Sequence, residues 1–451
     1  MTNYPSVALE VRSTQFGLEI TDDKGSAAAE TGILTVEKFG RNWPLPAGGI
    51  DSCSTIEWDN HAVVVRTSRL NPTTLYYWGS PGSDRFLVGT DRVGLLARIA
   101  KSTRSRADHT LHPIGAGRTL TFSPAATHDH LIVDDTVTER WTPSLIVGET
   151  AHEAGARQIA ALRREITAVG RPRPTTVVVS GGVDSGLVAV LAQEAGMVDH
   201  MASLGTPWGD EYAGADELGA HLDIPVQRIA LSEDDILRAL PETIRMLGTT
   251  DREAIAAGVN LVAVYRQGTI PAGTILTGVG ADLINSGHRV GSGPVADMQK
   301  AVAERLSEAA SSSELTGVGA AAHGYSLRHM YWNASVIQAA LDTAPEVMRY
   351  RDREKGHMRL AAEQLLPDSV AWRPKQALHH GSGVERNLDG AVARLIGAEQ
   401  VDTERFYGLI ESRLVEALLE SPTGPIHSDD CLEAAIAAYR AEAIDTLGVS
   451  L

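Results

Sequence analysis

The spacing of hydrophobic positions along the chain changes near residue 145. Before that point, short apolar runs are separated by Gly, Pro, Asn and Asp, a pattern typical of β-strands joined by turns. The runs are "LTVEKFG" (34–40), "STIEWDN" (54–60), "HAVVVRTS" (61–68), "TLYYWGS" (74–80), "RFLVGTD" (85–91) and "TLTFSP" (119–124). We therefore predict a mostly β, antiparallel domain over residues 1–145.

Beyond residue 145 the spacing becomes that of helices alternating with strands. Apolar positions in 147–170 recur at helical intervals, and this helix is interpreted as the entry to a second domain over 146–451. Strand-like and helix-like runs then alternate: 175–180 and 185–196, 201–206 and 214–223, 226–231 and 234–248, then 274–282. This alternation predicts an α/β fold with a parallel sheet that binds ligands at the carboxyl ends of its strands. After residue 297 the chain is predicted to be mainly helical, with a mobile loop at 308–324.

Composition narrows the possible partners and the compartment. The 451 residues carry a formal net charge of −17, which opposes binding to nucleic acid. There is no apolar run of about 18 residues and no signal-peptide pattern, so a soluble, cytoplasmic protein without a membrane partner is expected. Cys53 and Cys431 lie far apart and indicate neither a disulfide framework nor a zinc site. Lysine is rare, at positions 24, 38, 101, 300, 355 and 375, so a lysine in a loop stands out.

The stretch "VVVSGGVDSGLVAVLAQEAG" (177–196) carries the strongest local signal. Its β-branched start predicts a strand buried on both faces, and its second half predicts a helix, so residues 180–185 form the crossing. Gly181 and Gly182 allow backbone N–H groups to approach an anion at the positive end of that helix. The spacings of a P-loop and of a dinucleotide-binding turn are absent. Asp184 inside an anion-binding turn indicates that a cation, with Mg²⁺ the obvious choice, bridges it to phosphate.

"SGGVDS" (180–185) resembles the pyrophosphate-binding loop of the N-type ATP pyrophosphatases, and its surroundings resemble the asparagine synthetase and β-lactam synthetase group. Further segments match in the same order: "MASLGT" (201–206), "TGVGAD" (277–282), "HGYSLRHMYWN" (323–333) and "LLPDSVAWRPKQALHHGSG" (365–383). The "HxGSG" ending and "VYRQ" (264–267) look closer to β-lactam synthetases than to asparagine synthetases. The resemblance covers most of 176–383 and implies a parallel-sheet ATP-pyrophosphatase domain with a helical C-terminal part.

The resemblance also implies a reaction. In that group the loop grips the pyrophosphate of ATP while a carboxylate substrate is adenylated, and a nitrogen nucleophile then takes the acyl group. Asp184 and Asp282 are the implied Mg²⁺ ligands, and Lys375 is the implied catalytic cation, placed where negative charge develops. The implied ATP-binding residues are Val179, Ser180, Gly181, Gly182, Asp184, Ser185, Leu204, Gly205, Gly278 and Lys375.

The first domain resembles the glutaminase domain of asparagine synthetases more weakly, through residues 68–97 and 112–122. A glutaminase of that class needs a cysteine at position 2 as an N-terminal nucleophile. The chain instead starts Met-Thr-Asn, and Cys53 is internal. We therefore predict a degenerate Ntn-hydrolase-like domain without glutaminase activity, so that ammonia from glutamine is not expected as the nitrogen source.

Two positions depart from the family pattern. The residue three before the metal aspartate is Glu in asparagine synthetases and Tyr in β-lactam synthetases, the latter paired with a Glu; here these positions carry Val279 and Ser326. Neither side chain takes up a proton, whereas an alkylamine, with a pKa of about 10, needs a base at neutral pH. We predict either an acceptor nitrogen that is already neutral, or a base recruited elsewhere, with Tyr325 and His288 nearest in sequence.

Several functions stay open at this point. The leading hypothesis is an AMP-forming ligase that makes an amide, lactam or hydroxamate-like bond in natural-product biosynthesis, and closure of a β-lactam or of a lasso-peptide macrolactam is an alternative. A catalytically silent nucleotide-binding scaffold is favoured by Val279 and Ser326 and opposed by Asp184, Asp282 and Lys375. Nucleotide-dependent tRNA modification is disfavoured by the negative charge. Whether the chain forms a homodimer is left open.

Overall fold

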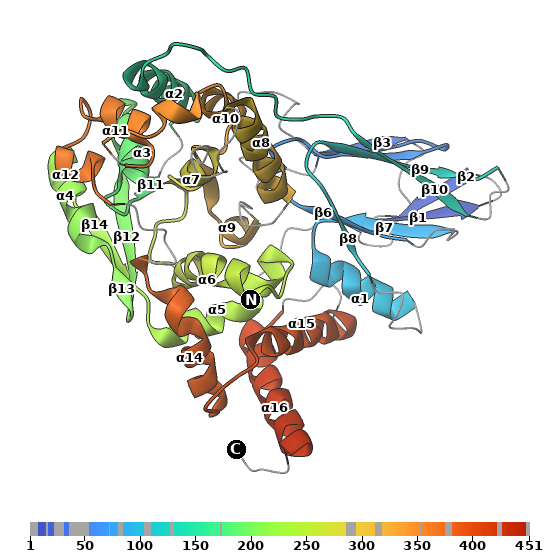
Figure 1. The fold of residues 1–451 in the computed structure, drawn as a ribbon. Coiled ribbons are helices and arrows are strands. Elements are labelled where there is room, and N and C mark those ends of the chain that lie inside the picture. Colours follow the sequence, from blue (N-terminus) through green and yellow to red (C-terminus); the bar gives the residue numbers. More distant parts are fainter. Residues whose placement is uncertain are drawn as a thin grey trace.

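The computed structural model of the chain shows a mixed α/β fold with three sheets (Figure 1). It describes residues 8–14, 17–21, 31–35, 54–71, 73–79, 84–102, 110–126, 130–171, 174–285, 295–311, 318–351, 353–374, 381–421 and 426–447. No helix within these ranges is both long enough and apolar enough to cross a membrane.

The first part of the chain is a sandwich of two antiparallel sheets. One has the order β2 (Gly17–Thr21), β1 (Ala8–Thr14), β7 (Arg85–Gly89), β6 (Leu75–Trp78), β8 (His112–Ile114); the other has the order β10 (Leu131–Val137), β9 (Arg118–Pro124), β5 (Val63–Arg66), β4 (Thr55–Trp58), β3 (Gly32–Thr35). The inward residues of both sheets form one apolar core, in which the rings of Phe86 and Phe122 stack with their centroids 3.8 Å apart. Each of the six predicted strands overlaps a strand of this sandwich.

The structure adds elements to this part that the pattern did not predict. Strands β1, β2, β8 and β10 complete the two sheets, and α1 (Arg92–Ser102) covers one of them. Leu95 and Ile99 of α1 pack on Leu87 of β7 and on its neighbours. The described strands of this region pair antiparallel, and α1 lies on the outer face of one sheet.

The second part is built around five parallel strands. Their order is β14 (Val226–Ala230), β12 (His200–Thr206), β11 (Thr175–Val178), β15 (Thr274–Thr277), β16 (Ser326–His329), and the short β13 (Gly209–Asp210) folds back antiparallel on β12. The chain runs outward from β11 through β12 to β14, and then returns to place β15 on the other side of β11. The strand order therefore reverses between β11 and β15. In open α/β sheets such a reversal leaves a crevice beyond the carboxyl ends of the strands.

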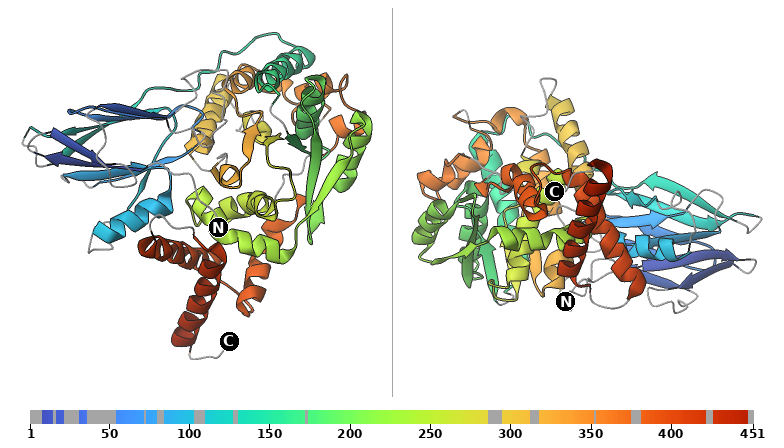
Figure 2. Two further views of the ribbon diagram at one scale, coloured as in Figure 1. Left: turned by 180° about the vertical axis from the view of Figure 1, so that it is seen from behind. Right: turned by 90° about the horizontal axis from the view of Figure 1, so that it is seen from below.

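Helices cover both faces of this parallel sheet (Figures 1 and 2). Successive strand residues face opposite ways, so that Met201 and Leu276 enter one core while Ala202 and Ile275 enter the other. The first core takes in α2 (Ala151–Ala168), α3 (Val183–Glu194), α4 (Tyr212–Leu222), α7 (Ala281–Ile284), α8 (Val295–Ser311), α10 (Ala334–Leu341), α11 (Gly356–Ala362) and α12 (Asp368–Ala371). The second takes in α5 (Glu233–Leu247), α6 (Arg252–Gln267), α9 (Val318–Ala322), α14 (Val384–Ile396), α15 (Thr403–Glu420) and α16 (Ser428–Leu447).

The structure refines two sequence-based predictions for the C-terminal region. Of the predicted mobile loop at 308–324, the first residues belong to α8, which continues to Ser311, and Val318–Ala322 form α9, while residues 312–317 lie outside the described residues. Both pieces are rich in alanine, which has the highest intrinsic helix propensity. The same region, predicted to be mainly helical, also contains β16, whose sequence "SLRH" has too few apolar residues to show a strand pattern.

The sandwich is joined to the parallel-sheet part by buried polar contacts. The indole N–H of Trp332 donates to the Leu70 carbonyl at 2.9 Å, and the Asn71 amide donates to the Ala310 carbonyl at 2.9 Å. Both donors are almost fully buried. Figure 2 shows α1 of the sandwich beside α15, on the same side of the molecule. The two parts are therefore in specific contact, and each part supplies the donor of one of these hydrogen bonds and the acceptor of the other.

Candidate functional site

The turn after β11 has a backbone that only glycine fits. β11 ends at Val178 and α3 begins at Val183. Gly181 between them has φ 71°, and a Cβ built on it would lie 2.1 Å from the Gly214 carbonyl carbon. The positive φ and the close approach of α4 both exclude a larger residue. The predicted crossing at 180–185 is thus a tight turn pressed against a neighbouring helix.

Two hydroxyls line this turn. The Ser180 amide donates to Ser185 Oγ at 3.1 Å, and the two hydroxyl oxygens lie 3.2 Å apart. The N-terminus of α3 has no side-chain cap, since Gly182 occupies the N-cap position, whereas α2 and α5 begin with complete capping boxes. The first-turn N–H groups of α3 and the positive end of its dipole are therefore available to an anion.

The turn after β15 packs directly against the start of α3. A Cβ on Gly278 would lie 2.9 Å from the Ser185 amide nitrogen and 3.0 Å from the Asp184 carbonyl carbon. Gly280 then adopts φ 93° and leads into α7, whose first turn carries Asp282. Asp184 occupies the first turn of α3 in the same way. Two carboxylates thus meet at the point where the strand order reverses.

A lysine joins these two carboxylates. Lys355 Nζ lies 2.5 Å from Asp184 Oδ2 and 2.7 Å from Asp282 Oδ1. The Lys355 side chain is 2% exposed and that of Asp184 9%, whereas Asp282 is 38% exposed. One ammonium group therefore bridges a buried and a partly exposed carboxylate. Of the two carboxylates, Asp282 is the one that reaches the open side of the site.

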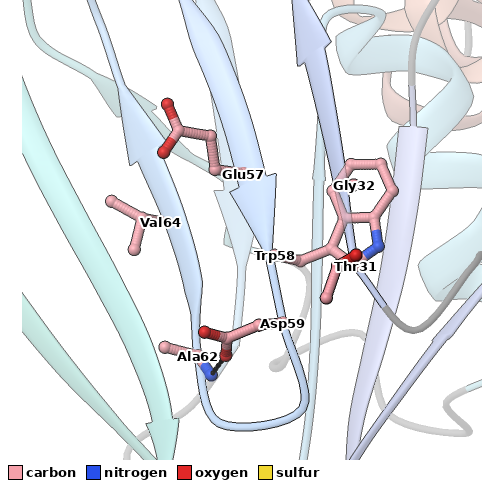
Figure 3. Close-up of a pocket in the computed structure, with 7 residues that line it drawn as sticks. All are labelled: Thr31, Gly32, Glu57, Trp58, Asp59, Ala62 and Val64. Carbon is pink, nitrogen blue, oxygen red and sulfur yellow. Dashed lines mark hydrogen bonds between the residues drawn. The ribbon is translucent and has the colours of Figure 1, made fainter.

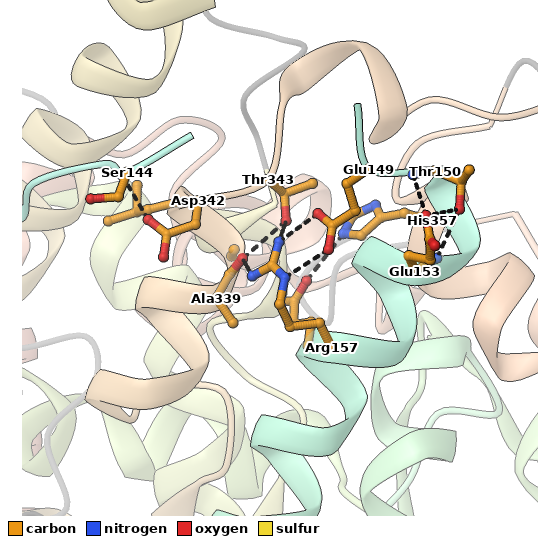
Figure 4. Close-up of polar contacts among 12 residues, drawn as sticks. Ser144, Glu149, Thr150, Glu153, Arg157, Ala339, Asp342, Thr343 and His357 are labelled. Carbon is orange, nitrogen blue, oxygen red and sulfur yellow. Dashed lines mark hydrogen bonds and ion pairs between the residues drawn. The ribbon is translucent and has the colours of Figure 1, made fainter. Parts of the chain in front are cut away.

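The position of Lys355 is set by the packing of α11 on α2. Lys355 is the N-cap residue of α11 and has the left-handed φ of 55°. Gly155 of α2 lets the two helices come close, because a Cβ there would lie 2.0 Å from the His357 carbonyl oxygen. The Arg157 guanidinium holds α2 in place by donating to Glu149 at 2.8 Å and to the Ala339 carbonyl at 2.7 Å (Figure 4).

Two ring side chains support the strand ends around the carboxylates. Burial, together with the charges of Asp184 and Asp282, raises the pKa of Tyr331 well above its ordinary value, so the phenol stays protonated. Its hydroxyl donates to the Asp184 carbonyl at 3.4 Å. His329 Nδ1 lies 2.7 Å from the hydroxyl of Thr277, and burial lowers the pKa of His329 to about 4. The imidazole is therefore neutral at pH 7.

The segments on either side of 375–380 are tied to the same edge of the sheet. On one side, the Arg359 guanidinium donates to the Arg373 carbonyl at 2.9 Å, and Arg373 itself pairs with Glu217 of α4 at 2.6 Å. On the other side, Thr206 at the end of β12 donates its hydroxyl to the Ser382 carbonyl at 2.5 Å. Lys375 itself, and residues 376–380, lie outside the described residues.

The structure brings most of the predicted site residues together. The turn residues, the two aspartates and the end of the β15 strand meet at the strand ends, and the end of β12 lies in the same sheet next to β11. These are Val179, Ser180, Gly181, Gly182, Asp184, Ser185, Leu204, Gly205, Gly278 and Asp282. His288, like Lys375, lies outside the described residues. The placement of the ten described residues agrees with their predicted grouping; their roles stay predictions.

Tyr325 and Ser326 lie at the opposite edge of the sheet. Ser326 is the first residue of β16 and pairs with Thr274, the first residue of the parallel strand β15. The Tyr325 hydroxyl donates to the Ile270 carbonyl at 2.9 Å, inside the second apolar core. The amino ends of these strands are remote from the turns that follow their carboxyl ends, so the structure does not group either residue with the aspartates.

Sequence reasoning missed Lys355. The rarity of lysine singled it out with five others, but Lys355 stands in the charged run "RDREKGH", which is typical of an exposed turn. Its burial depends on the glycine contact between α2 and α11, which no local pattern reveals. His329 was missed for a similar reason, because the strand that carries it was not predicted.

Other hollows of the surface do not contain this chemistry. One of about 470 Å³ lies on the second sheet of the sandwich, where Trp58 packs over Gly32 beside Glu57 (Figure 3). Another of about 560 Å³ lies at the far ends of α2 and α3, where Arg163, Arg171 and Glu194 line it together with smaller and apolar residues. Within the described residues, no group of three or more His, Cys, Asp or Glu side chains forms a protein-only metal site.

The fold and site define a class: an α/β protein with a tight glycine turn, an uncapped helix N-terminus and paired carboxylates at a switch point of its parallel sheet. The sequence model of the asparagine synthase family matches residues 168–318 and 318–439, well over half of the chain. The chain therefore belongs to the asparagine synthase family.

Individual relatives agree with this assignment. The chain is 31% identical over 253 residues to the carboxyethyl-arginine beta-lactam-synthase of Streptomyces clavuligerus, covering 55% of this chain and 48% of the relative. It is 23% identical over 259 residues to the glutamine-hydrolysing asparagine synthetase B of Escherichia coli K12, covering 52% of this chain and 46% of that one. The matches thus span about half the length of these relatives.

Proposed function

We propose that the chain is an ATP-dependent ligase that adenylates a carboxylate, releases pyrophosphate, and transfers the acyl group to a nitrogen nucleophile with release of AMP. The observation that carries this proposal is the meeting of the anion-binding turn with Asp184 and Asp282 at the β11/β15 switch point. Membership of the asparagine synthase family supports it.

The residues of the site have separable roles in this proposal. The backbone of residues 180–182, the hydroxyls of Ser180 and Ser185 and the α3 N-terminus hold the phosphates of ATP, and the ends of β11 and β12 face the nucleoside. Lys375 places a cation against the charge that develops during adenylation and during attack by the nitrogen. The described flanks of its segment are fixed at this edge of the sheet, which agrees with such a role.

The donor set fits Mg²⁺. Asp184 and Asp282 are hard oxygen ligands on neighbouring strand ends, and both reach one shared cation, the Lys355 ammonium, at 2.5 and 2.7 Å. Mg²⁺ in proteins is commonly held by one or two carboxylates together with substrate phosphates, so a third protein carboxylate is not required. When bound, Mg²⁺ would neutralise phosphate charge. Asp184 and Asp282 would orient it toward the turn.

The sandwich is proposed to be a degenerate glutaminase-like domain over residues 1–145, attached to a synthetase domain over 146–451. Its two facing antiparallel sheets agree with an Ntn-hydrolase-like origin. The nitrogen is proposed to come from an amine rather than from glutamine.

The acceptor is proposed to be a nitrogen that is neutral at pH 7. Val279, three residues before Asp282, is half-buried against the first apolar core and cannot accept a proton. A second candidate is intramolecular closure of a lactam, favoured by the 31% identity to the beta-lactam-synthase. The two differ in product mass, because closure removes one water from a single substrate.

The test is pyrophosphate release from ATP and Mg²⁺ across a panel of carboxylates and amino acids, with AMP and acyl products identified by mass spectrometry. We expect release that depends on one acid and falls at least ~100-fold in Asp184→Asn and Lys375→Ala. Amines of graded basicity added next should react best when weakly basic. Absence of release with every acid, while ATP still binds, would favour a catalytically silent scaffold.

A further inference from the structure

Lys355 is a buried lysine to which the proposed function assigns no role. Its ammonium contacts the same two carboxylates that the proposed function assigns to Mg²⁺, at 2.5 and 2.7 Å. Arg359, one turn after Lys355 in α11, is also buried. Its guanidinium donates to the carbonyls of Glu354, Ala371 and Arg373. Lys355, by contrast, contacts both aspartates directly.

The two carboxylates and the Lys355 ammonium together carry one net negative charge, and adding Mg²⁺ would give the group one net positive charge. The ammonium and a metal ion would lie within a few Å of each other and repel strongly in this buried setting. Phosphate oxygens of a nucleotide would offset that repulsion, because they supply further negative charge and further metal ligands. Metal binding should therefore depend on whether nucleotide is present.

The lysine cannot simply swing away. Its Cα is fixed by the left-handed N-cap of α11 and by the close contact of α11 with Gly155 of α2. Its side chain is 2% exposed. Exchange of the ammonium for solvent would leave a buried charge without partners, which is strongly unfavourable. The bridge is a fixed part of the site.

We propose that Lys355 is a built-in counter-ion that holds Asp184 and Asp282 together before substrates bind and that prevents a divalent cation from binding there without nucleotide. Metal and ATP then enter together, and the site is not blocked by a metal ion bound alone. This inference rests on the proposed function for the identity of the nucleotide, but its central measurement needs no carboxylic acid, no amine and no catalysis.

The test measures Mn²⁺ binding to the full chain by electron paramagnetic resonance, without nucleotide and with a non-hydrolysable ATP analogue. Mn²⁺ prefers the same oxygen ligands as Mg²⁺. Without nucleotide, Lys355→Met should bind Mn²⁺ about 10-fold or more tightly than the wild type. Lys355→Arg, which keeps the charge, should stay as weak as the wild type. Adding Asp282→Asn to Lys355→Met should remove the gain, which places the metal at this site.

The ATP analogue should raise Mn²⁺ affinity more in the wild type than in Lys355→Met. If the folded Lys355→Met protein binds Mn²⁺ no more tightly than the wild type, the proposal is overturned. If Lys355→Met does not fold, as judged by circular dichroism, the neutral Lys355→Gln takes its place with the same expected gain. Failure of the ligase proposal would instead appear as absent pyrophosphate release, with the nucleotide-free Mn²⁺ result unaffected.

Discussion

Gly278 is the residue whose lack of a side chain brings the two aspartates together. A Cβ at this position would lie 2.9 Å from the Ser185 amide nitrogen and close to other backbone atoms of the α3 start. Backbone cannot rotate aside as a flexible side chain can. Any larger residue must push the β15–α7 turn, and with it Asp282, away from Asp184.

We therefore expect Gly278→Ala to lower the free energy of unfolding by about 1–3 kcal/mol through overpacking. Pyrophosphate release should fall at least ~10-fold, because a shift of about 1 Å at a catalytic group is costly. Urea unfolding and the pyrophosphate assay measure the two effects. Gly408→Ala is the matched control: it lies in α15 with no heavy atom near its built Cβ, and should be neutral or slightly stabilising.

His329 makes the site edge sensitive to acid. The Val279 amide donates to the Thr277 hydroxyl oxygen at 3.3 Å, so that this hydroxyl in turn can donate to His329 Nδ1 at 2.7 Å. Protonation of Nδ1 removes the acceptor. Because burial lowers the pKa of His329 to about 4 from the ordinary 6.5, the neutral form is favoured in the folded state. This contribution is complete above pH 6.5 and is lost as the pH falls toward 4.

Between pH 8 and pH 5, His329 should account for about 2 kcal/mol of lost stability in the wild type. His329→Asn keeps an acceptor oxygen near the position of Nδ1 but does not titrate. Its free energy of unfolding should therefore fall less over the same interval. Urea unfolding at both pH values gives the comparison, and equal losses in the two proteins would contradict the assignment.

Some site residues are marked by the sequence immediately around them, and others are brought to the site only by tertiary contacts. Asp184 and Asp282 could be predicted because each follows a recognisable strand-and-glycine pattern, and parallel strands align their carboxyl ends. Lys355 could not, because it is brought in by a helix-to-helix contact at Gly155. The misplacement of Tyr325 has another cause: closeness in sequence says nothing about which edge of a sheet a residue lies on.

At the scale of elements, the short helix α11 fixes the positions of groups in two parts of the site. Its N-cap holds the ammonium of Lys355 against the aspartates, while Arg359, one turn later, fixes the end of α12 and the Arg373 carbonyl. Arg373 precedes Pro374 and Lys375 in the chain. One short helix thus sets the positions of a bridging cation and of the anchor of the predicted catalytic loop.

Arg359→Lys should therefore affect catalysis more than substrate binding. Lysine has one nitrogen and cannot span the carbonyls that the guanidinium fork reaches, so the free energy of unfolding should fall by about 2–3 kcal/mol. The kcat for pyrophosphate release should fall while the KM for ATP changes little, since Lys375 is expected to act mainly on developing charge. Steady-state kinetics separate the two. Arg351→Lys, an exposed partner of Glu363, is the control and should behave as the wild type.

Helices and strands whose apolar residues recur at regular spacing could be predicted from the sequence, and those without such a pattern could not. The apolar run of β11, the helix α2 with its Thr150–Glu153 capping box and the capped helix α5 all follow from local pattern. β10 and β16 did not, since β10 is exposed along six of its seven residues and has no buried face to give an alternating pattern. Strands of this kind are held by their neighbours in the sheet.

At the scale of the molecule, the buried contacts between the sandwich and the parallel-sheet part are expected to contribute to the free energy of unfolding. Substitution of Asn71 tests this contribution. Its backbone has a φ of 37°, and its side-chain amide donates to the Ala310 carbonyl at 2.9 Å. The Ala310 carbonyl lies in α8, which packs in the first core, so this bond spans the junction.

Asn71→Ala should lower the free energy of unfolding by about 2–4 kcal/mol, since it leaves a buried carbonyl unpaired and places alanine at a positive φ. Asn71→Gly loses the same bond but tolerates the φ, and should be less destabilised by about 1 kcal/mol. Urea unfolding followed by both tryptophan fluorescence and circular dichroism measures this. Wild-type stability in Asn71→Ala would show that the junction contributes nothing.

The bridge between Lys355 and Asp184 joins residues 171 positions apart, and this has a consequence for how the protein is made. At ribosomal rates of about 5–20 residues per second, Asp184 is synthesised roughly 10–35 s before its partner. Once Asp282 has also been made, and until Lys355 follows, the nascent chain holds two carboxylates without their shared cation. A fragment that ends before α11 would keep that defect permanently, so any shortened version of this protein has to extend beyond residue 362 to hold its site together.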